Sequence, residues 1–204
     1  ELTASWSTGS GAGTTRGGHL PGRLELDGKL TNARAARTFR YLPIGIPRET
    51  RDYLEQALQA GTVTSASYRV KGDLWDFPFF HAKSAKDGEF RIEAKVDDAR
   101  FAFAPQMTAS APAATVPATP ASGAAPVWPV FTALATDVVL ERGTLSLLNG
   151  RAQAGNLELR NVQGAIRSLD HDAQLGIDGT IRGPANDMLR VVATSPVGGW
   201  IGRA

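Results

Sequence analysis

The sequence has no cysteine among its 204 residues. This absence excludes a disulfide framework, a thiol nucleophile and any metal site built on cysteine. An excess of charge is also lacking, because 22 Lys and Arg residues face 20 Asp and Glu residues, for a formal net charge of +2. The basic footprint of a nucleic-acid-binding domain is therefore missing, and we predict no nucleic-acid partner.

Long hydrophobic runs are missing as well. No stretch of about 18 apolar residues occurs, so the sequence predicts no membrane-spanning helix. No basic segment followed by an apolar one opens the chain, as a signal peptide would. Leu2, Ala4 and Trp6 instead alternate with polar residues, as inside a strand. We therefore expect an internal fragment of a longer protein.

The local signatures of catalysis are absent too. His19, His81 and His171 lie far apart, and none belongs to an HExxH motif. No serine stands in a GxSxG motif. The glycine-rich residues 9–18 lack the Lys-Ser/Thr pair of a phosphate-binding loop, and Asp170–Asp172 is predicted to be a polar turn. We predict no catalytic residues, no metal and no cofactor, which makes a hydrolase the weakest functional hypothesis.

Alternating apolar and polar residues are the dominant pattern. In residues 22–32, leucines and a glycine alternate with Glu, Asp, Lys and Thr, which predicts a strand that is apolar on one face. The same pattern recurs at 66–71 and 90–103, and in close order from 138 to 181. Closely spaced strands without long helices favour an antiparallel meander over βαβ units.

Few helices are predicted. Residues 48–60 follow Pro47 and place apolar side chains at three- and four-residue spacing, with Gly61 expected as the left-handed residue after the helix. Residues 33–41 suit a helical turn. Its arginines recur every third residue and lie in solvent or, as the less favoured alternative, near acidic headgroups. A helical turn is also expected at 128–134, and a last helix at 186–193 with Asn186 as its N-cap.

Turn signals divide the strands. Glu141–Gly143, Asn149-Gly150 and Gly155-Asn156 are predicted turns, and the second is a strong hairpin dipeptide. At Asp97-Asp98 the apolar phase changes, which predicts a bulge or a tight turn and is favoured over a calcium site. Residues 105–127 are rich in Ala, Pro, Ser and Thr and are predicted to be a disordered insertion. Alternation resumes after them, so we expect one unit rather than two domains.

Several short motifs occur in an order that is similar to a known family. Between residues 20 and 197 the chain resembles the AsmA-like YhdP family of Gram-negative bacteria, with the insertion at 105–127 as a departure from its pattern. The motifs that carry the resemblance are Tyr41-Leu42-Pro43, the helix at 48–60, Gly72-Asp73-Leu74, Asp76-Phe77-Pro78-Phe79, Gly88-Glu89-Phe90, Trp128-Pro129 and Thr194-Ser195-Pro196.

The resemblance implies a fold and a function. Residues 1–204 would form one segment of a bridge-like lipid transporter that is tethered to the inner membrane and crosses the periplasm. The fold would be mainly β with a few short helices, an antiparallel meander curved into an open, taco-like groove. Its partners would be phospholipid acyl chains and neighbouring segments of the same long, membrane-associated chain. The family offers no catalytic residues to carry over.

Physical chemistry agrees with a lipid groove. A sheet that is apolar on one face needs a cover, and acyl chains supply one at about 0.8 kcal/mol per buried methylene, or on the order of 10 kcal/mol for ~16 carbons. Without polar anchors the lipid could slide. The candidate lining is Phe90, Ile92, Val96, Phe101, Phe103, Val138, Leu140, Leu145, Leu147, Leu157, Leu159, Leu175 and Ile177.

Two other interpretations fit the same residues. A closed sandwich would bury the same side chains, and the pattern alone favours that core, whereas the family resemblance favours the groove. A structural or protein-interaction module of the bacterial envelope would hold no lipid and would pair its sheet edges with neighbours.

Overall fold

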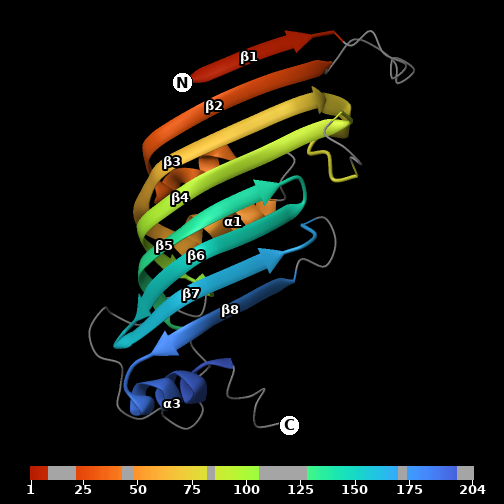
Figure 1. Ribbon diagram of the computed structural model, residues 1–204. Coiled ribbons are helices and arrows are strands. Elements are labelled where there is room, and N and C mark those ends of the chain that lie inside the picture. Colours follow the sequence, from red (N-terminus) through yellow and green to blue (C-terminus); the bar gives the residue numbers. More distant parts are fainter. Residues whose placement is uncertain (9–21, 43–47, 82–85, 106–127, 170–173, 197–204) are drawn as a thin grey trace.

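The computed structural model describes residues 1–8, 22–42, 48–81, 86–105, 128–169 and 174–196. Eight strands form one antiparallel sheet in the order β1 to β8, each beside its neighbour in sequence (Figure 1). The predicted meander is therefore confirmed. The strands are β1 (Leu2–Ser7), β2 (Arg23–Arg34), β3 (Leu58–Asp73), β4 (Gly88–Ala102), β5 (Val130–Glu141), β6 (Thr144–Ala154), β7 (Leu157–Ile166) and β8 (Leu175–Arg182).

Short helices join or follow these strands. The 3₁₀-helix η1 (Ala35–Tyr41) and helix α1 (Arg48–Ala57) connect β2 to β3, η2 (Leu74–Asp76) follows β3, and α3 (Ala185–Thr194) follows β8. The helical turn predicted at 33–41 is confirmed as η1. Helix α1 ends three residues earlier than predicted, because the chain enters β3 at Leu58.

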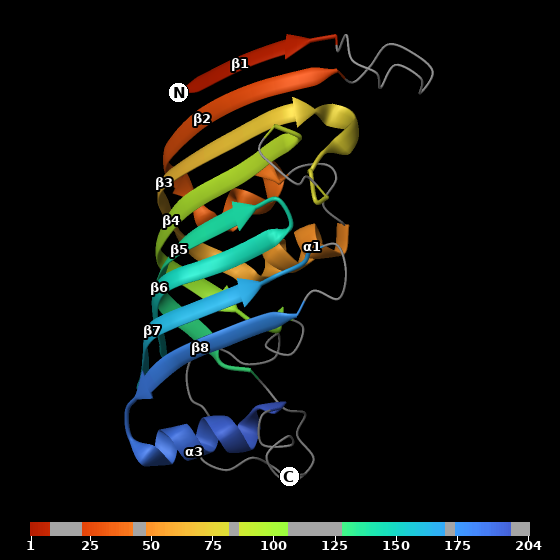
Figure 2. The same cartoon turned by 45° about the vertical axis from the view of Figure 1, so that its right-hand side comes forward.

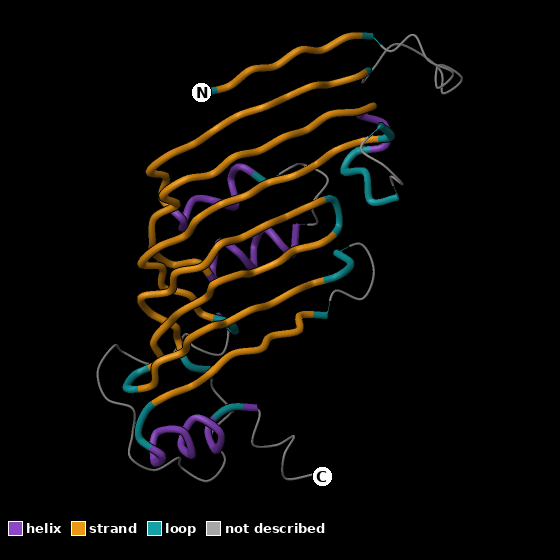
Figure 3. Tube along the Cα trace, viewed as in Figure 1, coloured by secondary structure: helices purple, strands orange, loops and turns teal. Residues whose placement is uncertain are grey.

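A line of bulges bends the sheet. Six successive strands, β2 to β7, each contain an interior residue with positive φ, and register shifts accompany most of these positions. Each bulge kinks its strand. Because the bulges lie close together across the sheet, they form one crease over which the strands turn (Figure 3). The six residues are Asn32 (54°), Gly61 (121°), Asp98 (48°), Ala133 (47°), Asn149 (55°) and Asn161 (51°).

The crease explains which turn predictions failed. The bulge expected at Asp97-Asp98 is confirmed. Asn149-Gly150 is not a hairpin but the bulge of β6, because the left-handed conformation that Asn tolerates serves either purpose. Gly61 likewise bends β3 instead of ending α1. The hairpin after β6 is at Gly155-Asn156, as predicted.

Residues 130–134 form the start of β5, so the helical turn expected at 128–134 is wrong. Val130 and Phe131 pair with Ala102 and Phe101 of β4. The bulge at Ala133 interrupts the two-residue alternation, and the resulting apolar spacing imitates a helix.

Helices η1 and α1 lie on the concave side of the sheet. They are behind the strands in Figure 1, and α1 comes into view on the right in Figure 2. Their main contacts with the sheet are to β2, β3 and β4. The guanidinium of Arg51 donates to the carbonyl of Leu42 at 2.9 Å, and the Tyr53 hydroxyl donates to the carbonyl of Phe103 at 2.9 Å. These bonds fix α1 against η1 and against the end of β4.

Helix α3 follows the last strand at the C-terminal end of the sheet (Figure 2). Its N-cap is Pro184, with no side-chain capping bond, so Asn186 is not the cap that we predicted. The Asn156 amide donates to Asp187 at 3.0 Å and ties α3 to the β6–β7 hairpin. None of the helices in the described ranges is long and apolar enough to cross a membrane.

Three predictions fall outside the described residues. These are the glycine-rich segment at 9–18, the polar turn Asp170–Asp172 and, apart from Pro105, the insertion at 105–127.

The buried core is small and lies at one rim of the concave face. Val70, Phe79 and Phe90 form it, and the turn after η2 carries Phe79 over the strands. Gly72 and Gly88 face each other on β3 and β4 and leave room for the Phe79 ring. A Cβ at Gly72 would lie 2.7 Å from ring atoms. This aromatic cluster closes only part of the concave face.

Candidate functional site: an open apolar trough

The strand register places apolar residues in a row across the whole sheet. Directly paired residues of neighbouring strands point to the same face. The first row has one member on every strand: Leu2, Gly28, Tyr68, Ile92, Leu140, Leu145, Ile166 and Leu175.

A second row runs parallel to the first, two residues along each strand and therefore on the same face. Its members are Leu30, Ala66, Ala94, Val138, Leu147, Gly164 and Ile177. We call the concave surface lined by these two rows the trough. In both rows, the Tyr68 hydroxyl is the single polar side-chain group.

The trough is not closed like a protein core. Leu2 is 61 % exposed and Ile177 is 54 % exposed, Leu30 and Leu175 are also exposed, and the other large row members are half-buried. In a sandwich these side chains would meet a second sheet and lose nearly all of their exposure. The closed-sandwich interpretation is therefore wrong for the described residues, which form one open sheet.

The trough contains most, but not all, of the predicted lining. Phe90 points to the same face but is covered by the Phe79 cluster and is 3 % exposed. Seven predicted residues lie in the two rows: Ile92, Val138, Leu140, Leu145, Leu147, Leu175 and Ile177.

The remaining five lie at or beyond the crease. There the strands turn away from the two rows. Phe101 pairs with Phe131, and the Phe103 ring contacts Trp128 with ring centroids 5.0 Å apart. Val96 is paired with Val63, Leu159 with Ile181, and Leu157, next to Ala154, is 3 % exposed.

Sequence reasoning omitted four large members of the rows: Leu2, Leu30, Tyr68 and Ile166. Each stands in an alternating segment, so the signal was present. Only the register of the paired strands shows that these four residues lie in the same rows as the predicted lining residues.

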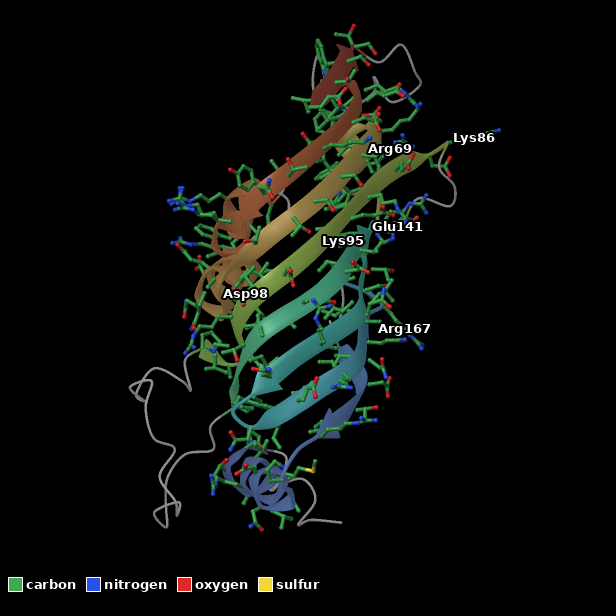
Figure 4. The ribbon with its side chains drawn as sticks, turned by 60° about the vertical axis from the view of Figure 1, so that its left-hand side comes forward. Arg69, Lys86, Lys95, Asp98, Glu141 and Arg167 are labelled. Atoms are coloured by element: carbon green, nitrogen blue, oxygen red, sulfur yellow. The ribbon has the colours of Figure 1, made fainter. Side chains whose placement is uncertain are left out.

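The convex face carries charged side chains that form ion pairs between neighbouring strands. Arg69 contacts Asp27 at 2.6 Å and Lys71 contacts Glu25 at 2.7 Å, both between β3 and β2. The hydrogen bond to Asp27, and then its charge, raises the pKa of Arg69. Figure 4 shows this face, with Arg69, Lys95 and Glu141 on successive strands.

A hollow of about 340 Å³ on this convex face is lined mostly by polar residues. Arg69 and Arg91 in its wall are already paired with carboxylates, Arg91 with Glu141 at 2.6 Å. Ion-paired polar side chains therefore line this hollow, and it would not shield acyl chains from water.

Metal-ligating side chains do not gather in the described ranges, where no group of three or more His, Asp or Glu residues could hold an ion. His81 is exposed within the β3–β4 connection, and His19 and His171 lie outside the described residues. That this chain is not an enzyme stays a prediction.

Comparison with known proteins identifies a family. The family model described as YhdP protein matches residues 4–204. No curated protein and no solved structure matches the chain. The match covers nearly the whole chain, and the chain therefore belongs to the YhdP family, a membership that indicates a role related to lipid transport.

Proposed function

We propose that this chain is one segment of a lipid conduit and that its trough shields phospholipid acyl chains between the inner and outer membranes. The observation that supports this most is the pair of apolar rows, which cross the sheet from edge to edge while their side chains stay partly exposed. An exposed apolar surface of this extent marks a site that something else covers.

The length of the trough suits an acyl chain. Eight strands are separated by seven spacings, and at ~4.8 Å each the rows extend over roughly 34 Å. One leaflet of a bilayer has a hydrocarbon thickness of about 15 Å. A lipid tail would therefore fit along the rows with room to move.

The apolar side chains of the rows would let a bound lipid slide along the trough instead of holding it in one place. Burial of methylenes against Ile, Leu and Val is favourable but has no preferred direction. Apart from the Tyr68 hydroxyl the rows contain no polar side-chain group, so a lipid that moves by one strand exchanges one apolar neighbour for another. Headgroups would stay at the wet mouth of the trough.

The cellular setting belongs to the same proposal. The full-length protein would lie in the periplasm, tethered to the inner membrane, and neighbouring segments of the chain would extend the trough at β1 and β8. Both are edge strands, whose outer backbone groups are available for pairing.

Two adjacent leucines provide the test. Leu147 lies in the second row and pairs with Val138, whereas Leu148 pairs with Asp137 on the opposite face. A photo-crosslinking amino acid at position 147 should capture phospholipid in bacterial cells, and the same group at 148 should not. Equal lipid capture at both positions, or none at 147 in a folded protein, would contradict the proposal.

The exposed edges also favour a second candidate function, a structural module that pairs with other proteins and carries no lipid. Trp6 on β1 is 51 % exposed and Ile181 on β8 is 52 % exposed. In that case the crosslinker at 147 should capture protein and no lipid, and crosslinkers on β1 and β8 should capture a partner chain.

A further inference from the structure

The 3₁₀-helix η1 carries positive charge that the described residues do not neutralise. Arg37 and Arg40 are exposed, and neither lies within 4.0 Å of a carboxylate of the described chain. The cations of β3 differ, since Arg69 and Lys71 each contact a carboxylate. The segment 34–42 contains three arginines and no acidic residue.

The geometry of η1 directs its two arginines to one side. A 3₁₀-helix has 3.0 residues per turn and rises ~2.0 Å per residue, so Arg37 and Arg40 lie above one another, roughly 6 Å apart along the axis. Like charges at this spacing repel each other. An anion between the two guanidinium groups would remove that repulsion.

Burial and hydrogen bonds hold η1 in place. Ala35 is fully buried, and the Thr38 hydroxyl donates to the Ala35 carbonyl at 2.6 Å. Arg51 of α1 donates to the carbonyl of Leu42 just after η1. The Arg40 guanidinium lies over the Phe39 ring, 5.6 Å from its centroid. The arginines are therefore presented on a fixed support.

The position of η1 connects it to the trough. It begins directly after β2 and contacts β3. Leu30 of the second row precedes Arg37 by seven residues, four of them along β2 and three along η1, which is at most roughly 19 Å along the chain. A tail of one leaflet's length, about 15 Å, covers most of this upper limit, so a lipid in the row can place its headgroup near η1.

We propose that Arg37 and Arg40 bind the phosphate of a phospholipid whose tails lie in the trough. Guanidinium groups bind phosphate oxygens with paired, charge-assisted hydrogen bonds. The inference rests on the proposed lipid conduit and adds a selective step at its rim. Lipids that carry a phosphate are held there, and lipids without one are not.

The test compares two short-chain lipids that differ in the phosphate. Binding of monomeric dihexanoyl-phosphatidylglycerol and of dihexanoylglycerol is measured for the whole chain, for Arg37→Gln/Arg40→Gln and for Arg167→Gln/Arg182→Gln. The last variant removes two exposed arginines elsewhere, Arg167 being labelled in Figure 4, and it matches the change in net charge.

We expect the η1 variant to bind the phospholipid about ten-fold more weakly than the control, because charge-assisted hydrogen bonds are lost. Binding of dihexanoylglycerol should not change. Added salt should weaken phospholipid binding by the unmodified chain and leave the uncharged lipid unaffected.

Three results would overturn this inference while leaving the conduit intact. They are equal phospholipid affinity in both variants, an equal loss for both lipids, and binding of inorganic phosphate as tight as that of the phospholipid, which would identify a free-anion site. Failure of the unmodified chain to bind dihexanoylglycerol is a different result, and it would overturn the conduit together with this site.

Discussion

Replacing Gly88 by alanine tests how the aromatic cluster is held on the trough rim. A Cβ at this position would lie 2.5 Å from Cγ and 2.8 Å from Cε1 of Phe79. Carbon atoms in favourable contact are about 3.5–4.0 Å apart. Phe79 is 1 % exposed, so its ring has no free space around it and can avoid the clash only by leaving its packed position.

The expected cost follows from the two ways in which the chain can respond. Expelling the ring forfeits the burial of a phenylalanine, about 2–3 kcal/mol, and shifting the backbone to make room costs about 1–3 kcal/mol. We therefore expect Gly88→Ala to lower the free energy of unfolding by about 2–3 kcal/mol. At about 3 °C per kcal/mol, the unfolding temperature falls by roughly 6–9 °C.

Urea unfolding followed by tryptophan fluorescence measures this change, and Gly176→Ala is the matched control. The nearest atom to a Cβ at Gly176 is the Ala165 carbonyl oxygen at 3.9 Å, so that substitution should be nearly neutral. In a Phe79→Ala background, Gly88→Ala should also become nearly neutral, because the clash is gone. Equal costs at the two glycines, or a cost that persists without Phe79, would refute the steric argument.

The other predictions concern single contacts. Asn149→Val should lower the free energy of unfolding by about 1–2 kcal/mol more than Asn149→Gly in urea unfolding, because a branched residue resists positive φ while both variants lose the amide bond to Asp137. The hydrogen bond from Arg160 lowers the pKa of Glu158, so this pair stabilises the fold above the unfolded pKa and loses its effect as the pH falls through the folded value. Arg160→Gln should return the pKa of Glu158 to its ordinary range in an NMR titration, and an unchanged value would contradict the assignment. Partial burial raises the pKa of Tyr53, which is 37 % exposed, so one tyrosine should ionise above the ordinary range in an absorbance titration, and Tyr53→Phe should remove both that ionisation and about 1 kcal/mol of stability.

Alternation predicted nearly every strand, because a half-buried strand must place apolar residues at every second position. The errors cluster at the crease. At Asn149 and Ala133 the sequence contains signals that turns, helices and bulges share, since each requires a local departure from extended backbone. Nothing local distinguishes a residue that bends a strand from one that ends it. Whether such a residue bends its strand or ends it depends on the neighbouring strand, which has its own irregular residue nearby.

In the candidate site, too, local alternation predicted some features and strand pairing or packing decided the others. Leu147 and Ile177 lie in the trough rows, as the alternation of their own strands predicts, and their contact with lipid stays a prediction. Phe90 was selected by the same rule but lies under Phe79, which arrives from a turn more than ten residues earlier in the chain. Leu2 and Ile166 were omitted although their segments alternate, because only strand pairing shows that they complete the first row.

The sequence by itself determined the strands, their apolar and charged faces and, through the order of its motifs, the family. Those features follow from local periodicity and residue type. The tertiary structure alone decided where the sheet bends, because the bend depends on irregular residues that lie side by side on neighbouring strands. It also decided which apolar side chains stay partly exposed, because exposure depends on what packs opposite them.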